Sequence, residues 1–348
     1  MVRTLKILGA RSKSTVYLGE SLRSLRNYIP VEKTVILSDA NVRHLYGPQF
    51  PPCRLIEIGS GERVKNLDTV RDIYSMLTEM EVDRSSFLVG IGGGIVCDIT
   101  GFVATTYLRG LRFGFVPSTL LSQVDASVGG KNGVNLDGYK NIIGTFNQPD
   151  FVICDTGLLR ALPKREISNG LAEVVKHALI GDASLFHYLE KNLEDVLKLD
   201  RRCMEKIIHD SLVIKASIVN RDERETGIRR KLNFGHTLGH AIEKSAGISH
   251  GEAVSVGMCF AARFSQGKGY LAEGDVKRIE KLLGNLGLPT ALDSYDIDDL
   301  FEAVRRDKKR EKEKIHFVLL DGIGKAVTEE VDLDELYDTL KTISQESA

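Results

Sequence analysis

Three histidines in the second half of the chain, together with a glutamate near its middle, have the spacing of a metal site. His236 and His240 are four residues apart, so a helix would place both on one face, a common geometry for two metal ligands. His250 follows shortly, and Glu173 adds a carboxylate inside an otherwise apolar helical stretch. Two histidines and one carboxylate leave coordination positions open, as catalytic zinc sites do. Any one of these histidines alone is more often an ordinary surface or core imidazole, and only their clustering with flanking glycines makes the two interpretations equal.

A glycine triplet at 92–94 joins a predicted strand to a predicted helix. Glycines let the backbone approach a pyrophosphate, and the N-terminus of the following helix favours anions. Ile95, Val96 and Cys97 follow the triplet, so the usual GxGxxG spacing is not met, and a purely structural turn is an equal alternative. Asp39 follows another predicted strand, where it could bind a ribose hydroxyl or serve as a helix N-cap.

Several lysines and arginines lie in apolar or glycine-rich surroundings. A single lysine of this kind usually extends its ammonium group to solvent, which is the structural interpretation of each one. Several together suggest a pocket for a phosphate and a carboxylate. Asp125 is a further polar residue in a stretch that we expect to be buried. The cations are Lys131, Lys140, Lys176, Lys215, Arg229 and Arg230.

The composition is that of a globular chain without an overall charge. Of 348 residues, 42% are hydrophobic and 27% are charged, which argues against a disordered, collagen-like or coiled-coil protein. The formal net charge is -1, so we expect no nucleic-acid partner. Apolar runs are too short for a membrane span, and the first residues lack a signal-peptide core, so we expect no membrane partner. Five scattered cysteines without a CxxC pair fit a reducing, cytoplasmic location.

Alternating strands and helices in the first half predict a mainly parallel sheet with helices on both faces. After about residue 159, helical periodicity dominates, and a single strand is expected. We therefore predict an α/β dinucleotide-binding domain at 1–159 and a mostly helical metal- and substrate-binding domain at 160–348. The expected strands are 34–37, 54–58, 87–91, 113–116, 151–154 and 315–320, and the expected helices are 66–80, 166–180, 200–219, 232–245, 252–266, 275–286, 297–306 and 334–343.

In combination, these segments resemble the 3-dehydroquinate synthase family of the sugar-phosphate cyclases. The resemblance extends from Asp39 to Lys309 and implies a dehydroquinate synthase-like fold, with an NAD-binding α/β domain and a helical metal domain. It also implies a homodimer in which Arg109 reaches the site of the partner subunit. The segments that carry it are 92–98, 116–131, 140–144, the helix of Glu173 and Lys176, 232–240 and 250–254.

The resemblance implies a step of the shikimate pathway, which serves chorismate and aromatic amino-acid biosynthesis. The anionic substrate would be 3-deoxy-D-arabino-heptulosonate 7-phosphate, and the products 3-dehydroquinate and phosphate. NAD would oxidise the substrate transiently, and a zinc ion, or cobalt, would polarise the reacting oxygen. Phosphate β-elimination, reduction, ring opening and intramolecular aldol closure would follow, which makes the enzyme a carbon–oxygen lyase. The alternatives are a metal-dependent NAD polyol dehydrogenase, another sugar-phosphate cyclase, and a catalytically silent NAD-binding protein.

The resemblance also implies roles for individual residues. It implies Glu173, His236 and His250 as metal ligands, and it keeps His240 for substrate and proton transfer. The presence of His240 favours dehydroquinate synthase over an aminocyclitol-forming cyclase. The residues implied around NAD are Asp39, Asn41, Glu62, Lys65, Gly93, Gly94, Ile95, Asp98, Ser118, Thr119, Leu121, Asp125, Lys131 and Lys140, and those implied around the substrate are Lys131, Asn141, Lys176, Lys215, Arg229, Asn233 and one of Lys308 and Lys309.

Overall fold

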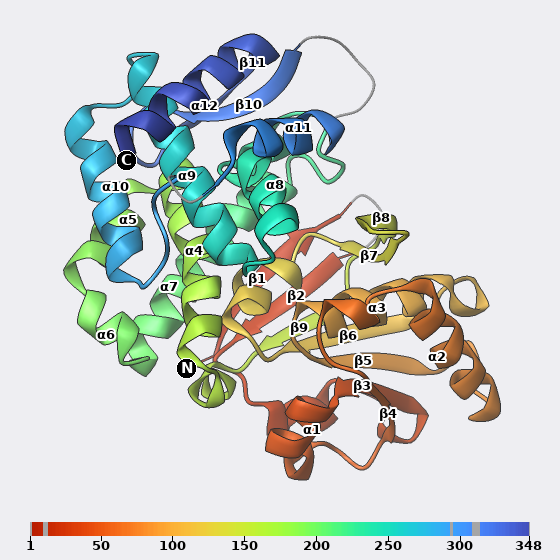
Figure 1. Cartoon of the computed structure of the whole chain (residues 1–348). Helices are drawn as coiled ribbons and strands as arrows, with labels where there is room; N and C mark the ends of the chain where they lie inside the picture. Colours follow the sequence, from red (N-terminus) through yellow and green to blue (C-terminus); the bar gives the residue numbers. More distant parts are fainter. Residues whose placement is uncertain (1, 10–12, 293–294, 308–313, 348) are drawn as a thin grey trace. The chain divides into compact units, whose positions relative to one another are not determined.

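The computed structural model describes residues 2–9, 13–292, 295–307 and 314–347, which form two units (Figure 1). The first unit comprises Met1–Pro163 and Met204–Arg224, and the second comprises Lys164–Cys203 and Glu225–Ala348. Helix α7 (Arg201–Val219) therefore contributes to both units. The domain division at residues 159 and 160 stays a prediction. Among the described helices, none combines the length and the apolar character that a membrane span needs.

A seven-stranded sheet forms the centre of the first unit. Its strand order is β1-β2-β9-β6-β5-β3-β4, and all neighbouring strands are parallel except β1 and β2. Because β3 lies between β4 and β5, the chain reverses its direction across the sheet there, and such switch points bind ligands in α/β proteins. The mainly parallel sheet is confirmed. Its strands are β1 (Arg3–Leu8), β2 (Lys13–Leu18), β3 (Thr34–Asp39), β4 (Arg54–Ile58), β5 (Phe87–Gly92), β6 (Arg112–Pro117) and β9 (Phe151–Cys154).

Alternate residues of β5 face opposite layers of the first unit, because side chains alternate along a strand. Phe87, Val89 and Ile91 belong to one buried apolar core. On the other face, a Cβ at Gly90 would lie 2.8 Å from Thr100 Oγ1, so glycine lets α3 approach the sheet closely. Val42 of α1 belongs to the same apolar core, so helices cover both faces, as expected. This unit also contains α1 (Ala40–Tyr46), α2 (Leu67–Glu79), α3 (Gly94–Thr106), the part of α7 from Met204 onward, and the antiparallel hairpin of β7 (Lys131–Leu136) and β8 (Tyr139–Phe146).

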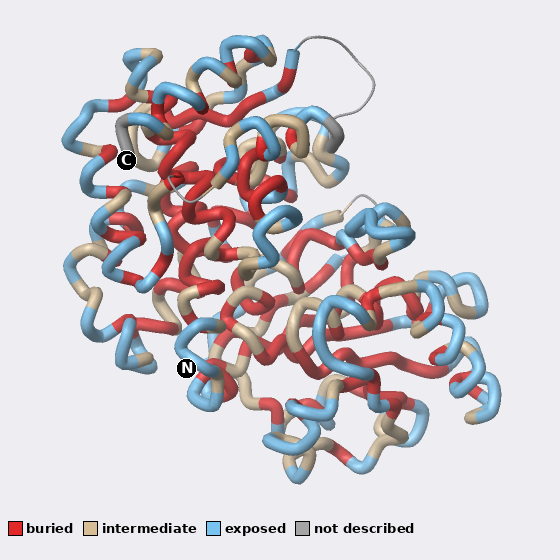
Figure 2. The backbone as a smooth tube through the Cα atoms, viewed as in Figure 1, coloured by how far each residue is buried: buried red, intermediate tan, exposed pale blue. Residues whose placement is uncertain are grey.

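Helices build most of the second unit, as predicted. Long stretches of α4 and α9 are buried, as Figure 2 shows. The prediction of a single strand is wrong, because β11 pairs antiparallel with β10. Adjacent charged residues, Glu329 and Glu330, interrupt the apolar pattern of β11 and conceal it in the sequence. The elements are α4 (Lys164–Gly181), α5 (Ala183–Lys191), α6 (Leu193–Leu197), α7 (Arg201–Val219), α8 (His236–Ala246), α9 (His250–Gly267), α10 (Glu273–Asn285), α11 (Ile297–Asp307), β10 (Lys314–Leu320), β11 (Ala326–Asp332) and α12 (Leu333–Ser347).

One predicted helix, at 232–245, begins later in the structure. A 3-10 turn ends at Asn233, and α8 starts after Gly235, whose φ is 76°. A Cβ at Gly235 would lie 2.6 Å from Met258 Cγ on α9 and 2.9 Å from the Met258 backbone nitrogen. The left-handed conformation and the close approach both require glycine. Consequently, His236 is the first residue of α8.

Candidate active site

The carboxylate candidate lies in the buried part of α4. Glu173 is fully buried, and Lys176, one turn later, is only 2% exposed. The Lys176 ammonium forms an ion pair with Glu173 Oε2. Burying a single charge costs several kcal/mol, and an opposite charge in contact offsets that cost. Lys176 therefore allows an ionised carboxylate at this depth.

Glu173 Oε1 faces two imidazoles from neighbouring helices. His236 Nε2, on α8, lies 3.4 Å away, and His250 Nε2, on α9, lies 3.2 Å away. One potential ligand atom from each of the three residues lies within 4.8 Å of the others. A metal ion with bonds of about 2 Å can contact three atoms at such separations. The geometry can therefore hold one metal ion.

The other ring nitrogen of each imidazole also has a partner. His236 Nδ1 lies 3.0 Å from the carbonyl oxygen of Phe234, and His250 Nδ1 lies 3.3 Å from Glu243 Oε2. If each Nδ1–H donates to its acceptor, a neutral ring has its Nε2 lone pair available for a metal ion beside Glu173. Metal-binding histidines usually have their second nitrogen held by a carbonyl or a carboxylate in this way. Without a metal ion, the charged His250 ring donates its Nε2–H to Glu173 Oε1.

Burial affects the two imidazoles differently. Burial, together with the nearby Lys176 ammonium, lowers the pKa of His236 well below its usual value. His236 is therefore neutral, as a metal-binding imidazole must be. Burial also lowers the pKa of His250, but hydrogen bonds and attraction to Glu173 and Glu243 outweigh it and raise the pKa to about 9. The two carboxylates thus stabilise the charged form of His250.

His240 lies near this three-residue group without being one of its members. Its ring centre is 5.3 Å from that of His236 and 6.3 Å from that of His250. Spacing along the helix pairs His236 with His240, whereas the structure brings His236 together with His250 and Glu173. The sequence interpretation missed Glu243, although it is three residues after His240 on the same helix and so on the same face.

Three residues expected near NAD lie together at the carboxyl edge of the first unit's sheet. Asp39 ends β3, while Gly93 and Ser118 directly follow β5 and β6. The Ser118 N–H donates to the carbonyl oxygen of Gly92, at 2.8 Å. Asp39 Oδ1 accepts from two N–H groups of α1, so its N-cap role is confirmed, and its ribose contact stays a prediction. The group adjoins the switch point, where α/β sheets bind ligands.

Among the described residues, no side chain caps the N-terminus of α3. Gly93 is the N-cap residue, and a Cβ at Gly94 would lie 3.2 Å from the Ala126 Cβ. The first backbone N–H groups of a helix lack partners within the helix, and the helix dipole favours an anion beside them. This glycine-lined helix start therefore suits a pyrophosphate.

Two buried lysines of the first unit pair with other predicted site residues. Lys65 Nζ lies 2.5 Å from Asp98 Oδ2 and 2.5 Å from Asn141 Oδ1. Lys215 Nζ lies 2.7 Å from Asp125 Oδ1. Burial raises the pKa of Asp98, and the Lys65 ammonium opposes that rise. The structure thus joins residues expected at the cofactor to residues expected at the substrate.

Arg229 and Asn233 lie on the 3-10 turn that precedes α8. Arg229 is only 3% exposed, and Asn233 Nδ2 donates to Glu225 Oε1, at 2.5 Å. Arg109 is exposed and has φ of 68°. Lys308 and Lys309 lie outside the described residues. The other predicted residues are Asn41 on α1, Glu62 on a 3-10 turn, Ile95 in the first turn of α3, Thr119 and Leu121 after β6, Lys131 on β7 and Lys140 on β8.

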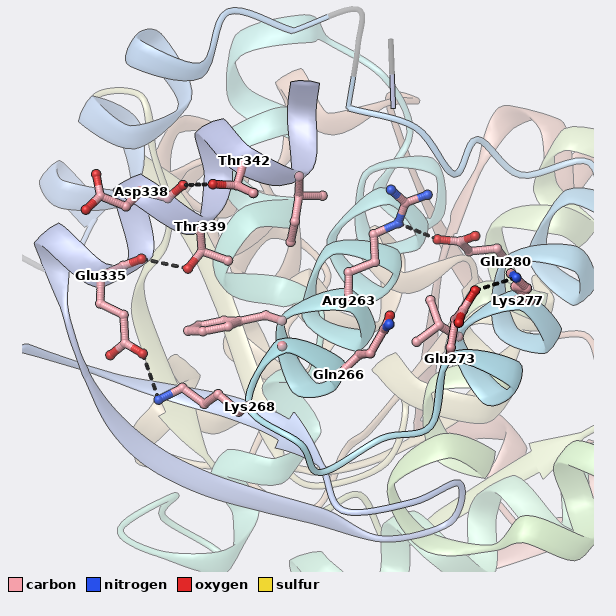
Figure 3. A pocket seen from close by; sticks show the side chains of 14 residues that line it. Arg263, Gln266, Lys268, Glu273, Lys277, Glu280, Glu335, Asp338, Thr339 and Thr342 are labelled. Atoms are coloured by element: carbon pink, nitrogen blue, oxygen red, sulfur yellow. Dashed lines mark hydrogen bonds and ion pairs between the residues drawn. The ribbon is translucent and has the colours of Figure 1, made fainter. Parts of the chain in front are cut away.

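A groove between α9, α10 and α12 in the second unit contains none of the predicted site residues (Figure 3). Most of the charged side chains that line it pair with one another. Arg263 Nε lies 2.6 Å from Glu280 Oε1, and Lys268 Nζ lies 2.9 Å from Glu335 Oε1. Because these charges compensate one another, the groove gives no indication of a charged ligand.

Known proteins resemble the chain over nearly its whole length. Residues 55–169 match the family described as 3-dehydroquinate synthase N-terminal, and residues 170–310 match 3-dehydroquinate synthase C-terminal. The 3-dehydroquinate synthase of Dehalococcoides mccartyi is 42% identical over 323 residues, which are 90% of each chain.

Solved structures with the same fold include two cyclases. A 2-deoxy-scyllo-inosose synthase complexed with carbaglucose-6-phosphate, NAD+ and Co2+ has a TM-score of 0.87 and 28% identity, and the match covers 98% of this chain and 100% of that chain. A 2-epi-5-epi-valiolone synthase from Streptomyces hygroscopicus with NAD+ and Zn2+ bound has a TM-score of 0.88 and 27% identity, and the match covers 99% of both. From the two family matches and the identity to the curated relative, the chain belongs to the 3-dehydroquinate synthase family.

Proposed function

We propose that the protein converts 3-deoxy-D-arabino-heptulosonate 7-phosphate to 3-dehydroquinate and phosphate, as a carbon–oxygen lyase of the shikimate pathway. Family membership supports the reaction. The observation that carries the proposal is the convergence of Glu173 Oε1 with Nε2 of His236 and Nε2 of His250. NAD and a divalent metal, zinc or cobalt, are the proposed cofactors, and the groups bound to the two structural relatives support both.

The residues of this chain suit both cofactors. Two imidazole nitrogens and one carboxylate oxygen are a donor set of catalytic zinc sites, and Phe234 and Glu243 hold the second nitrogen of each imidazole. The uncapped start of α3 suits the pyrophosphate of NAD. When bound, the metal would supply Lewis acidity at a substrate oxygen, and NAD would supply a reversible hydride acceptor.

Buried cations would bind the anionic groups of the substrate. Lys176 and Arg229 are 2% and 3% exposed, and hydrogen bonds from such charged donors are stronger than neutral ones. Lys176 would also keep Glu173 ionised through their ion pair. His240, whose ring adjoins that of His236, would transfer protons to and from the substrate. We also propose that Lys215 and Asn141 contact the substrate, as the resemblance implies.

We further propose a cytoplasmic homodimer in which Arg109 reaches the site of the partner subunit. Leu108 and Arg109 have φ of 49° and 68°, and such conformations persist where function requires them. All five cysteines are free, which supports a reducing compartment. Light scattering tests the dimer. Mixed dimers of Arg109→Ala and His236→Ala subunits should regain activity that neither variant has alone, because one site then combines an intact Arg109 with intact metal ligands.

Phosphate release from the heptulosonate phosphate under limiting NAD tests the main proposal. Many turnovers per NAD, without accumulation of NADH, are expected because the hydride returns to the substrate. A polyol dehydrogenase would instead stop after one equivalent and accumulate NADH. Another sugar-phosphate cyclase would leave this substrate unchanged and accept a different sugar phosphate. Either result would reject the proposal.

A further inference from the structure

Asn135, near the end of β7, joins two segments that carry predicted site residues. Its Oδ1 accepts a hydrogen bond from the backbone N–H of Asn141, at 2.9 Å. Its Nδ2 donates to Glu62 Oε1, at 2.7 Å. Its own backbone N–H donates to the carbonyl oxygen of Lys65, at 2.9 Å. One half-buried asparagine thus contacts three residues that the proposed function places at the cofactor and the substrate.

Lys65 also contacts Asn141 directly, through its side chain. Its ammonium, on a side chain that is 7% exposed, lies 2.5 Å from both Asn141 Oδ1 and Asp98 Oδ2. Asn141 has φ of 53°, a left-handed conformation that asparagine tolerates better than most residues do. The bond from the Asn141 N–H to Asn135 therefore supports an uncommon backbone conformation, and that conformation directs the Asn141 amide to Lys65.

Asn135 also lies at an irregularity of the hairpin. Val134 pairs with Ile143, but Leu136 pairs with Tyr139, so the register shifts between the two pairs. Such bulges redirect side chains and occur frequently next to active sites. Between these two pairs, β7 has one residue and β8 has three. Asn141 is one of those three, so regular strand pairing does not fix its position. The Asn135 side chain supplies a contact that the strand pairing does not.

We propose that Asn135 is a positioning residue, which fixes Glu62, Lys65 and Asn141 in the geometry that binds NAD and the substrate. The inference rests on the proposed function, in which Glu62 and Lys65 surround NAD and Asn141 contacts the substrate. Side chains that are already held in place lose less conformational freedom when a ligand binds. Asn135 itself touches no reacting atom, so its removal should affect binding more than turnover.

Two substitutions separate the two arms of the Asn135 side chain. Asn135→Ala removes both the acceptor for Asn141 and the donor to Glu62, so it should raise the Kd for NAD and the KM for the heptulosonate phosphate, each by about tenfold. Asn135→Asp keeps the acceptor but places a second carboxylate against Glu62. It should therefore raise the Kd for NAD by at least as much, while the KM for the heptulosonate phosphate changes less.

Thr145→Val is the matched control on the same hairpin. Thr145 Oγ1 lies 2.8 Å from Thr105 Oγ1 on α3, and valine keeps the side-chain shape without this hydrogen bond. The control should leave the Kd and the KM within about twofold, because this hydrogen bond joins Thr145 to Thr105, and neither of them is a predicted site residue. Calorimetric titration of the full-length protein with NAD alone gives the Kd, and steady-state kinetics give the KM and kcat. Thermal denaturation of each variant shows whether the fold is retained.

A Kd and a KM within twofold of wild type in folded Asn135→Ala would overturn the inference. Equal losses in Asn135→Ala and Thr145→Val would also overturn it, because hairpin stability would then explain both. If Asn135→Ala does not fold, the nearly isosteric Asn135→Asp tests the inference instead, and an unchanged Kd for NAD in this variant would overturn it. Wild-type protein that does not bind NAD would reject the proposed function, and this inference with it. Wild-type binding with unchanged variants would reject only the role of Asn135.

Discussion

Removal of the Glu243 carboxylate should weaken metal binding without changing any of the three proposed ligands. Glu243→Met keeps a side chain of similar length but offers no acceptor within the 3.3 Å that separates Glu243 Oε2 from His250 Nδ1. The His250 ring would then rotate more freely and lose the contact that directs its Nε2 toward Glu173. Glu243→Gln retains an acceptor oxygen and should restore most of the affinity.

The geometry sets the size of the expected effect. Loss of such an outer contact typically weakens metal binding by about 10- to 100-fold. The 3.3 Å separation is long for a charge-assisted hydrogen bond, and the Glu243 side chain is 16% exposed, so water can replace part of the contact. We therefore expect the Kd for Zn2+ to rise by about tenfold, or about 1.4 kcal/mol.

Competition with a chromophoric chelator measures the Kd for Zn2+ of the metal-free protein at constant pH. The visible absorption of Co2+ reports the coordination geometry in the same variants. Lys244→Met is the matched control, because it changes a charge on the next residue of α8, which is exposed. Its Kd should remain within about twofold of wild type. Equal Zn2+ affinity in Glu243→Met and wild type would refute the reasoning, and so would an equal loss in the Lys244→Met control.

Three further predictions concern stability and metal content. Lys176→Met should destabilise the metal-free protein by about 3–5 kcal/mol in urea denaturation, because Glu173 loses the cation that offsets its buried charge, and Zn2+ should restore part of this loss. The Arg278 hydrogen bond lowers the pKa of Glu190 from 4.5, so this pair should stabilise the fold by under about 1 kcal/mol above that pH. Wild type should therefore be more stable than Glu190→Gln near neutral pH, and the difference should disappear as acid protonates Glu190. A difference that stays constant down to about pH 3 would contradict this prediction. His236→Ala should lose zinc, measured by atomic absorption, and keep NAD binding in the first unit; full zinc occupancy would exclude His236 as a ligand.

Helices with a continuous apolar stripe could be predicted from the sequence. In α2, Val70, Ile73 and Leu77 are buried at helical spacing, and the helix begins one residue from the expected position. Strands with few buried side chains could not be predicted as easily. In β1, only Ile7 is buried, and in β11 only Ala326 and Val331 are buried, so neither segment has the run of apolar residues that indicates the central strands.

The candidate site could be predicted at the level of residue types, but not of orientation. Spacing pairs His236 with His240, and it is the resemblance to the family that implies Glu173, His236 and His250 as the ligands. The direction of each imidazole depends on a partner at Nδ1, and the start of α8 depends on the approach of α9 to Gly235. Asn135 acts through a register shift between strands. Contacts of this kind form only when distant segments pack together, so the pattern of apolar and polar residues along the sequence cannot predict them.

The order in which the ribosome makes the chain differs from the order in which the first unit is completed. After residue 163, the chain first forms part of the second unit, at 164–203. It then returns to the first unit at 204–224. The returning segment carries Lys215, whose ammonium bonds Asp125. Domains commonly fold as they emerge during synthesis, but this one must wait for residue 224. A recombinant first unit would therefore need 204–224 attached to residue 163 by a linker that replaces 164–203.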